Sequence, residues 1–455
     1  MASVLARLQG SGLMARALRS ASWMIVGYGG GQAMRLASNL ILTRILFPEA
    51  FGMMALVTVI VTGLVLFSDV GIGPSILQSD RGDDPAFLDT AWSIQVVRGL
   101  CLWGVTFLLA WPVAQFYDVP DLTYILPLAG TMLAVEGFKT TRIETAHRHL
   151  MVGRVTQLEL ASQFVSLALM VGVALLTQSV LALVLGTVMQ SLTYVMFTHI
   201  NLPGHRNRFH WDKASARELI GFGKWIFLST AFWFVTTQGD RAILGKFISL
   251  ETLGVYNIAF FLASFPMALG YAVNQRLMIP VYRDALANAD HTSRRKQRML
   301  RFALSAGILS LVWIMAIIGP WLVELLYDER YHLAGAIIVP LALALAPAVI
   351  VMTYDQAALA AGDSKTYFMV SAARAISQTV LFLFGVASIG LPGGIAAMGA
   401  ALLFTYPFII ALALKHRVWD PLHDGIMAGL TLGVGYVALH IHWDLIVAMV
   451  TALRP

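Results

Sequence analysis

Residues 337–352 form the stretch Ile-Ile-Val-Pro-Leu-Ala-Leu-Ala-Leu-Ala-Pro-Ala-Val-Ile-Val-Met, which contains no charged side chain. A helix that crosses a bilayer needs about 20 mostly apolar residues. Because backbone groups in lipid must be hydrogen-bonded within the protein, only helices and closed barrels cross membranes. The stretch has the length of a helix, and it lacks the alternation of polar and apolar residues that marks a barrel strand. It therefore predicts a transmembrane helix.

The composition extends this prediction to the whole chain. Of its 455 residues, 58% are hydrophobic and 12% are charged, and the mean hydropathy is +0.74. Soluble domains carry about 25% charged residues, so most side chains here are expected to face lipid or other helices. A single cysteine, Cys101, excludes a disulfide framework and a cysteine-rich metal site. We predict an all-α, polytopic membrane protein with 12–14 transmembrane helices and no metal or other cofactor.

Apolar runs of suitable length recur along the chain. The predicted spans are 22–46, 50–77, 87–115, 122–145, 150–177, 180–200, 219–247, 252–278, 299–326, 332–360, 366–389 and 394–414, followed by a shorter pair at 424–440 and 443–453. Residues 279–298 form the longest predicted loop, and Arg301 is grouped with its basic residues.

The loops between these spans alternate in charge. One set is rich in arginine and lysine, from Arg7, Arg16 and Arg19 onward, whereas the opposite loops contain one clear basic residue, Arg330. Basic residues near span ends stay in the cytoplasm, which predicts a cytoplasmic N-terminus. The same rule explains the net charge of +6, so no nucleic-acid partner is expected.

An internal repeat divides the predicted helices into two halves. At an offset of 202 residues, Leu-Ile-Leu-Thr-Arg-Ile-Leu-Phe-Pro-Glu-Ala-Phe-Gly (40–52) aligns with Ala-Ile-Leu-Gly-Lys-Phe-Ile-Ser-Leu-Glu-Thr-Leu-Gly (242–254), and Trp23 aligns with Trp225. Parallel repeats around a central substrate path are a transporter architecture. The predicted organisation is a cytoplasmic segment (1–20), two six-helix halves (21–205 and 206–418) and a C-terminal membrane hairpin (419–455).

Two groups of residues carry a family resemblance. They are segment 38–52 with Asp69-Val-Gly-Ile-Gly73, and Gly239-Asp-Arg241 with Leu244-Gly-Lys246 and Glu251-Thr-Leu-Gly-Val-Tyr256. These strings resemble the polysaccharide transporter (Wzx-type oligosaccharide flippase) family of the multidrug/oligosaccharidyl-lipid/polysaccharide exporter superfamily.

The resemblance implies a location in the bacterial cytoplasmic (inner) membrane, among membrane lipids. It implies alternating access that flips undecaprenyl-diphosphate-linked oligosaccharide repeat units for exopolysaccharide, capsule or O-antigen. The polymerase and chain-length regulator of the same pathway are the further partners it suggests.

Four arginines fall inside predicted spans, where an ionised side chain is costly unless it faces a cavity or a partner. Arg35 lies about 18 Å along its helix from Trp23, at 1.5 Å per residue. Guanidinium groups match the geometry of diphosphate oxygens, which predicts a basic cavity for an anionic head group. Its predicted residues are Arg35, Arg98, Arg241 and Arg374, with the polar neighbours Gln32, Asn39, Gln95 and Gln378.

Several other residues keep two interpretations. Asp69, Glu136, Glu159 and Asp240 lie in or beside predicted spans, as counter-ions of arginines or as coupling sites for a proton or cation. Arg241 either enters the cavity or pairs with Asp240. The run Gly27-Tyr-Gly-Gly-Gly31 either bends its helix or lets a neighbouring helix approach closely.

Two other function classes fit the sequence less well. A membrane enzyme of the same pathway, such as a polysaccharide polymerase, needs a catalytic outer loop, and every predicted outer loop is a few residues long. A cation-coupled multidrug or toxin antiporter needs an acidic cavity, whereas the excess charge within the spans is arginine. The absence of a Gly-x4-Gly-Lys-Ser/Thr phosphate loop excludes ATP hydrolysis by this chain.

Overall fold

The computed structural model describes residues 13–287 and 291–453, and helices with short connections account for these residues. Most of the predicted cytoplasmic segment 1–20, Arg7 included, lies outside the described residues. The chain divides into two compact units, Met1–Ala231 and Phe232–Pro455. The all-α prediction is confirmed.

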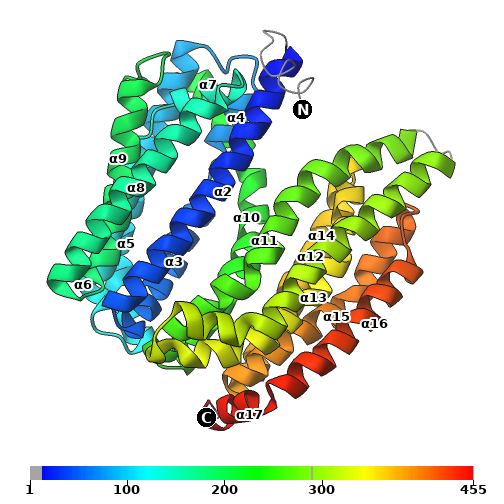
Figure 1. Cartoon of the computed structure of the whole chain (residues 1–455). Helices are drawn as coiled ribbons and strands as arrows, with labels where there is room; N and C mark the ends of the chain where they lie inside the picture. The colour runs from blue at the N-terminus through cyan, green and yellow to red at the C-terminus, as the bar shows by residue number, and fades with distance from the viewer. Residues whose placement is uncertain (1–12, 288–290, 454–455) are drawn as a thin grey trace. The chain divides into compact units, whose positions relative to one another are not determined.

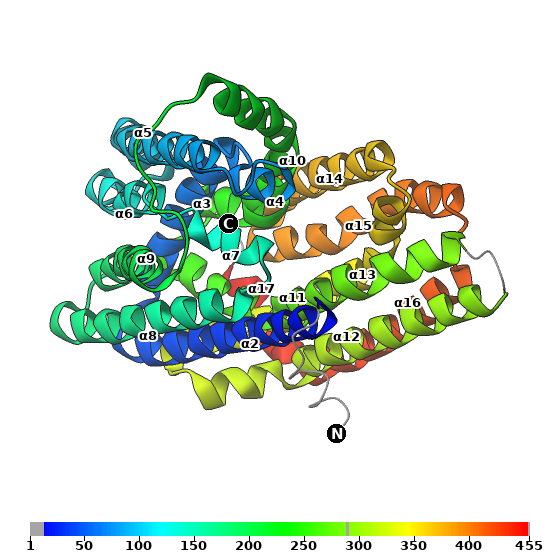
Figure 2. The same ribbon diagram turned by 90° about the horizontal axis from the view of Figure 1, so that it is seen from above.

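The first unit contains a row of long helices with two short ones at the end where the chain begins (Figures 1 and 2). Its helices are α2 (Leu13–Ile45), α3 (Pro48–Phe67), α4 (Ile72–Gln78), α5 (Pro85–Tyr117), α6 (Leu122–Gly137), α7 (Arg142–Arg148), α8 (Val152–Thr177) and α9 (Leu181–Asn201). Helix α10 (Lys213–Phe247) begins in this unit and continues into the second.

The second unit is built around α13, which packs against α11, α12 and α15. Its helices are α11 (Leu250–Ala287), α12 (His291–Leu326), the 3₁₀ turn η1 (Glu329–Tyr331), α13 (His332–Ala360), α14 (Ser364–Ile389), α15 (Leu391–Lys415), α16 (Pro421–Ile441) and α17 (Trp443–Ala452). The stretch 337–352 lies in α13 and is mostly buried, because helices surround α13 within the unit.

Among the described residues, ten helices are long and apolar enough to cross a membrane: α3, α5, α8, α9 and α11–α16. Helix α6 has 16 residues, whereas α2 and α10 have 33 and 35. Helix α17 has 10 residues, which is about 15 Å and half of a bilayer core. The chain is therefore a polytopic membrane protein, as predicted.

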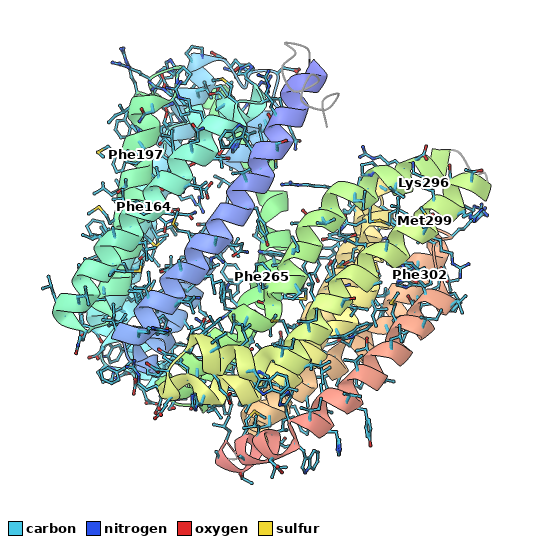
Figure 3. All side chains as sticks on the ribbon, in the orientation of Figure 1. Phe164, Phe197, Phe265, Lys296, Met299 and Phe302 are labelled. Atoms are coloured by element: carbon cyan, nitrogen blue, oxygen red, sulfur yellow. The ribbon has the colours of Figure 1, made fainter. Side chains whose placement is uncertain are left out.

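Large apolar side chains cover the outer surfaces of these helices. Phe164 on α8 is 63% exposed and Met299 on α12 is 64% exposed (Figure 3). In water such surfaces would be costly, whereas in a bilayer they face hydrocarbon.

Two predicted spans are wrong in their extent. The span 50–77 is divided into α3 and α4, because Gly71 has φ 65° and its backbone N–H donates to Asp69 Oδ1 at 2.8 Å. The span 122–145 is divided into α6 and α7 by the connection 138–141. The first break was missed because the apolar residues of α4 continue the run of α3. Helix α7 is polar, so the second span was drawn too far beyond the apolar helix α6.

The predicted loop 279–298 is wrong for its described residues. Helix α11 extends to Ala287 and α12 begins at His291. The polar residues that favoured a loop lie on helices that are longer than a membrane span.

The repeat in the sequence has a counterpart in helix boundaries. Helix α2 ends at Ile45 and α3 begins at Pro48, while α10 ends at Phe247 and α11 begins at Leu250. Both boundaries differ by 202 residues, the offset of the aligned strings. The division into halves at residues 205 and 206 stays a prediction.

Candidate functional site

Helices α2 and α8 approach closely through glycines. A Cβ atom added to Gly27 would lie 2.6 Å from Thr156 Cγ2, and one added to Gly30 would lie 3.1 Å from Leu160 Cδ2. One added to Gly153 would lie 2.6 Å from Trp23 Cδ1. The contacts advance together along both helices, so α2 and α8 run parallel. This geometry favours the packing interpretation of the glycine run.

A polar stripe runs along the face of α8 that looks towards α2 and α9. Glu159, Ser162, Gln163 and Ser166 follow the spacing i, i+3, i+4 and i+7, which places them on one helix face. The Ser166 hydroxyl donates to the carbonyl of Gly186 on α9 at 2.7 Å. The sequence analysis named only Glu159 of these residues, although the helical spacing of four polar side chains on an apolar helix predicts a polar face.

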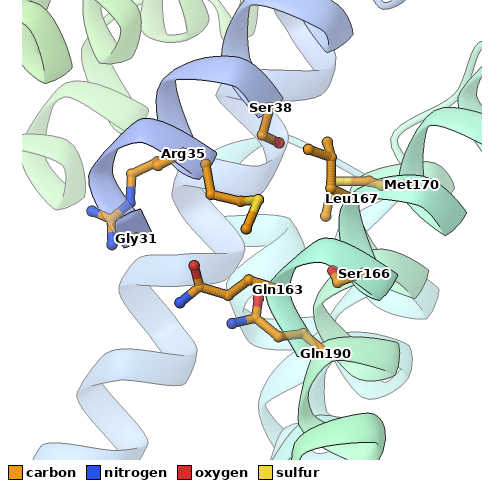
Figure 4. A pocket seen from close by; sticks show the side chains of 9 residues that line it. Gly31, Arg35, Ser38, Gln163, Ser166, Leu167, Met170 and Gln190 are labelled. Carbon is orange, nitrogen blue, oxygen red and sulfur yellow. The ribbon is translucent and has the colours of Figure 1, made fainter. Parts of the chain in front are cut away.

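The first cavity of the unit lies between α2, α8 and α9 and has a volume of about 130 Å³. Figure 4 shows Gln163 and Gln190 side by side, while the Arg35 guanidinium extends away from them. The lining consists of Gly31, Met34, Arg35, Ser38, Gln163, Ser166, Leu167, Met170 and Gln190. Arg35 therefore stands at the edge of a cavity rich in amides and hydroxyls.

Arg35 is an exposed cation in the middle of α2. No hydrogen bond or ion pair links its guanidinium to another described residue. A charge at mid-helix in a membrane protein is costly unless it meets water, a counter-ion or a ligand. The Arg35 guanidinium is therefore available for an ion pair with an anionic ligand.

A second cavity adjoins the first, because Gln190 lines both. Its volume is about 260 Å³, and its lining is Glu136, Lys139, Glu159, Ser162, Gln190, Ser191 and Tyr194. Lys139 Nζ lies 3.3 Å from Glu136 Oε1, which also accepts a hydrogen bond from Ser191 Oγ at 3.3 Å. Glu136 and Glu159, predicted separately from the sequence, thus meet in one cavity.

Arg98 and Gln95 on α5 hold the ends of two neighbouring helices. Arg98 donates to Val65 O at 2.6 Å and Ser68 Oγ at 2.9 Å at the end of α3. The Gln95 amide donates to three carbonyls at the end of α6, those of Glu136, Gly137 and Lys139. Asp69 attracts Arg98 electrostatically. These donors are occupied within the protein, so their role towards a ligand stays a prediction.

Arg241 and Asp240 belong to a polar cluster between α10 and α11. Arg241 donates to Asn257 Oδ1 at 2.9 Å, and its guanidinium lies 4.4 Å from the Phe260 ring centre. Buried Asp240 accepts a hydrogen bond from Tyr256 at 2.7 Å and lies 3.8 Å from Arg241 Nη1. Arg241 and Asp240 thus both have polar partners on α10 and α11, as the pairing interpretation of Arg241 expects.

Arg374 on α14 forms a two-pronged ion pair with Asp355 on α13, at 3.0 and 3.2 Å. Gln32 donates to the Tyr28 hydroxyl at 3.1 Å. Asn39 and Gln378 are half-buried, and Gln32, Asn39 and Gln378 are outside the sets that line the two cavities. Of the four predicted arginines, Arg35 lines one of these cavities.

Arg301 does not belong to a loop, which corrects its grouping with the basic loop residues. It is 1% exposed on α12, and Nη2 lies 2.6 Å from Asp424 Oδ1 on α16. Asp424 also accepts hydrogen bonds from Tyr354 and Tyr406, both at 2.8 Å. The partners lie far apart in sequence, so no local pattern could have revealed the pair.

Residues 41–336 match the family described as polysaccharide biosynthesis protein. The chain belongs to this family. Among its described residues, this polysaccharide biosynthesis protein has ten helices that are long and apolar enough to cross a membrane.

Three curated relatives have names that refer to the biosynthesis of a polysaccharide. The teichuronic acid biosynthesis protein TuaB of Bacillus subtilis is 20% identical over 56% of this chain and 54% of its own length. The lipopolysaccharide biosynthesis protein WzxC of Escherichia coli is 20% identical over 69% and 62%. The succinoglycan biosynthesis transport protein ExoT of Rhizobium meliloti is 18% identical over 81% and 74%. The chain thus matches between about half and three quarters of these relatives.

Solved structures share the fold of this polysaccharide biosynthesis protein. An inward closed structure of the lipid II flippase MurJ has a TM-score of 0.63 at 11% identity, covering 94% of this chain and 100% of that one. An inward-facing multidrug resistance transporter has a TM-score of 0.62 at 12% identity, covering 88% and 96%. At these identities the likeness establishes the fold alone.

Proposed function

We propose that the protein is a flippase that moves undecaprenyl-diphosphate-linked oligosaccharide repeat units across the cytoplasmic membrane by alternating access. Family membership and the names of the relatives support a transport role in exopolysaccharide, capsule or O-antigen synthesis. The observation that carries the proposal is Arg35, an exposed guanidinium at mid-helix beside a cavity lined by amides and hydroxyls. A diphosphate offers this cation the bidentate contact that guanidinium groups favour.

The proposed orientation places the N-terminus in the cytoplasm. The short helices α4 and α7 lie at the end of the first unit where α2 begins (Figure 1), and the basic loops flank them. Retention of basic residues on the cytoplasmic side supports this orientation. The polymerase and chain-length regulator of the pathway are proposed partners on the opposite side.

The test is complementation of a strain that lacks the gene. Lipid-linked sugars are extracted and quantified after expression of the wild type, Arg35→Ala or Arg35→Lys. We expect the precursor to accumulate without the protein, to be cleared by the wild type and to persist with Arg35→Ala. Arg35→Lys keeps the charge but loses the planar fork, so partial clearance is expected.

Arg44→Ala is the matched control, because Arg44 lies on the same helix in its last turn. It removes one positive charge away from the cavity lining and should clear the precursor. Membrane abundance of each variant is measured alongside. Unchanged precursor levels in the deletion strain, with increased sensitivity to cationic drugs, would instead support the antiporter alternative.

A further inference from the structure

The lining of the second cavity differs in its chemistry from the lining of the first cavity, where Arg35 lies. It presents two carboxylates, one ammonium, one amide, two serine hydroxyls and one phenol. Its position along α8 is also distinct: Gly30 lies against Leu160, so Arg35 is about 9 Å further along the parallel helices than Glu159, at 1.5 Å per residue. The two adjoining cavities can therefore hold two different parts of one ligand.

The charges within this cavity are partly balanced. Lys139 lies 3.3 Å from Glu136 and 5.7 Å from the Tyr194 ring centre, so Glu136 already has a cationic partner. The Glu159 side chain is exposed on the same lining, and no hydrogen bond or ion pair joins its carboxylate to another described residue. Glu159 is thus an available acceptor in a cavity whose other carboxylate is neutralised.

Donors and acceptors are mixed around this space, as carbohydrate recognition requires. Each sugar hydroxyl donates one hydrogen bond and accepts others, and carboxylates accept while ammonium and amide N–H groups donate. Hydrogen bonds to an ionised carboxylate are about twice as strong as neutral ones. A diphosphate, by contrast, would be repelled by Glu159. The lining therefore fits the neutral, hydroxyl-rich part of a glycolipid.

We propose that the cavity formed by Glu136, Lys139, Glu159, Gln190 and Tyr194 binds the hydroxyl groups of the lipid-linked sugar. Glu159 accepts from the sugar, and Lys139 and Gln190 donate to it. Arg35 takes the diphosphate to which that sugar is joined, on the side of α2 to which its guanidinium extends (Figure 4). This inference rests on the proposed flippase function and makes Glu159 a specificity-determining residue.

The test compares two ligands that differ in the sugar. The full-length protein in detergent is titrated with lipid-linked oligosaccharide extracted from the deletion strain, and separately with bare undecaprenyl diphosphate. Glu159→Ala should weaken binding of the sugar-bearing lipid at least tenfold, the effect of losing a charged hydrogen-bond acceptor. It should leave the affinity for the bare lipid within twofold. Arg35→Ala should weaken binding of both lipids.

Two further variants keep the result interpretable. Glu159→Gln retains the size and one acceptor oxygen, so its loss of sugar-bearing lipid affinity should be smaller than that of Glu159→Ala. Glu49→Gln, an exposed carboxylate in the first turn of α3, should change neither affinity. Elution as a single species from gel filtration verifies that each variant is folded.

Three results would overturn the inference. Glu159→Ala could weaken both lipids equally, or weaken neither. It could also leave binding intact while abolishing precursor clearance in cells, which would assign Glu159 to coupling by a proton or cation. If the wild type binds neither lipid, the flippase proposal itself fails, and this outcome is distinct because it precedes any effect of Glu159.

Discussion

Replacing Asp424 by asparagine removes the negative charge that faces the buried guanidinium of Arg301 and changes the side-chain volume very little. Arg301 is 1% exposed, and its Nη2 atom lies 2.6 Å from Asp424 Oδ1. The Tyr354 and Tyr406 hydroxyls, which donate to Oδ2 at 2.8 Å, keep an oxygen acceptor in the variant. The substitution therefore removes the charge and also the Oδ1 acceptor, because the amide NH2 group then faces Arg301 and the His423 Nδ1 atom, which lies 2.9 Å from Oδ1.

The expected loss of unfolding free energy is large because the buried Arg301 guanidinium cannot reach water. Removing one partner of a buried ion pair typically costs about 3–5 kcal/mol, since the other charge stays buried without compensation. In a unit the size of Phe232–Pro455, each 1 kcal/mol lowers the unfolding midpoint by roughly 2–4 °C. Asp424→Asn should therefore lower the apparent midpoint by roughly 10 °C.

The assay is thermal unfolding of the purified protein in detergent, followed by gel filtration of the remaining monodisperse fraction. Arg298→Gln is the matched control. It breaks a pair between α12 and Asp420, the N-cap residue of α16, but Arg298 is 51% exposed, so a loss below about 1 kcal/mol is expected. The double variant Arg301→Met, Asp424→Asn removes both charges and should melt above Asp424→Asn. Equal midpoints for Asp424→Asn and Arg298→Gln would refute the reasoning.

Two further predictions concern helix packing and pH. Gly99→Val should sharply reduce the folded yield in a fluorescence gel-filtration screen, because a Cβ atom there would lie 2.6 Å from Leu133 O and 2.8 Å from Gly137 Cα. Gly104→Ala is the control and should express normally, since a Cβ atom at Gly104 would meet open space. A normal yield for Gly99→Val would contradict the close crossing of α5 and α6. The hydrogen bonds of Lys415 and Thr366 lower the pKa of Asp363 below its usual 3.8, so its stabilisation is present above about pH 4 and lost as the pH falls through the lowered folded-state pKa. The midpoints of wild type and Asp363→Asn should therefore converge on acidification below pH 4, and a difference that stays constant with pH would contradict this linkage.

Long apolar runs made most helices predictable, since span length is set by bilayer thickness. Helix α8, for example, covers 152–177 where 150–177 was expected. The break at Gly71 was missed, because it depends on one positive φ angle and on Asp69, which hydropathy does not register.

The candidate site was only partly visible in the sequence. Arg35, Glu136 and Glu159 stood out as charges in apolar spans, and the structure places all three along two adjoining cavities. Gln163 and Gln190 were missed, because neutral polar residues carry a weaker signal than charges. Arg374 was identified, but its partner Asp355 lies on another helix, and only tertiary packing brings them together.

Gly31, the last glycine of the run on α2, also lines the first cavity beside Arg35. A Cβ atom at Gly31 would lie 3.6 Å from Gln163 Oε1, an ordinary van der Waals contact, so an alanine would fit there and occupy part of the first cavity. The charge at Arg35 and the bulk at Gly31 sit one helical turn apart and can vary independently. In the proposed flippase, side-chain bulk at Gly31 would therefore change the space beside Arg35 while the guanidinium itself is kept.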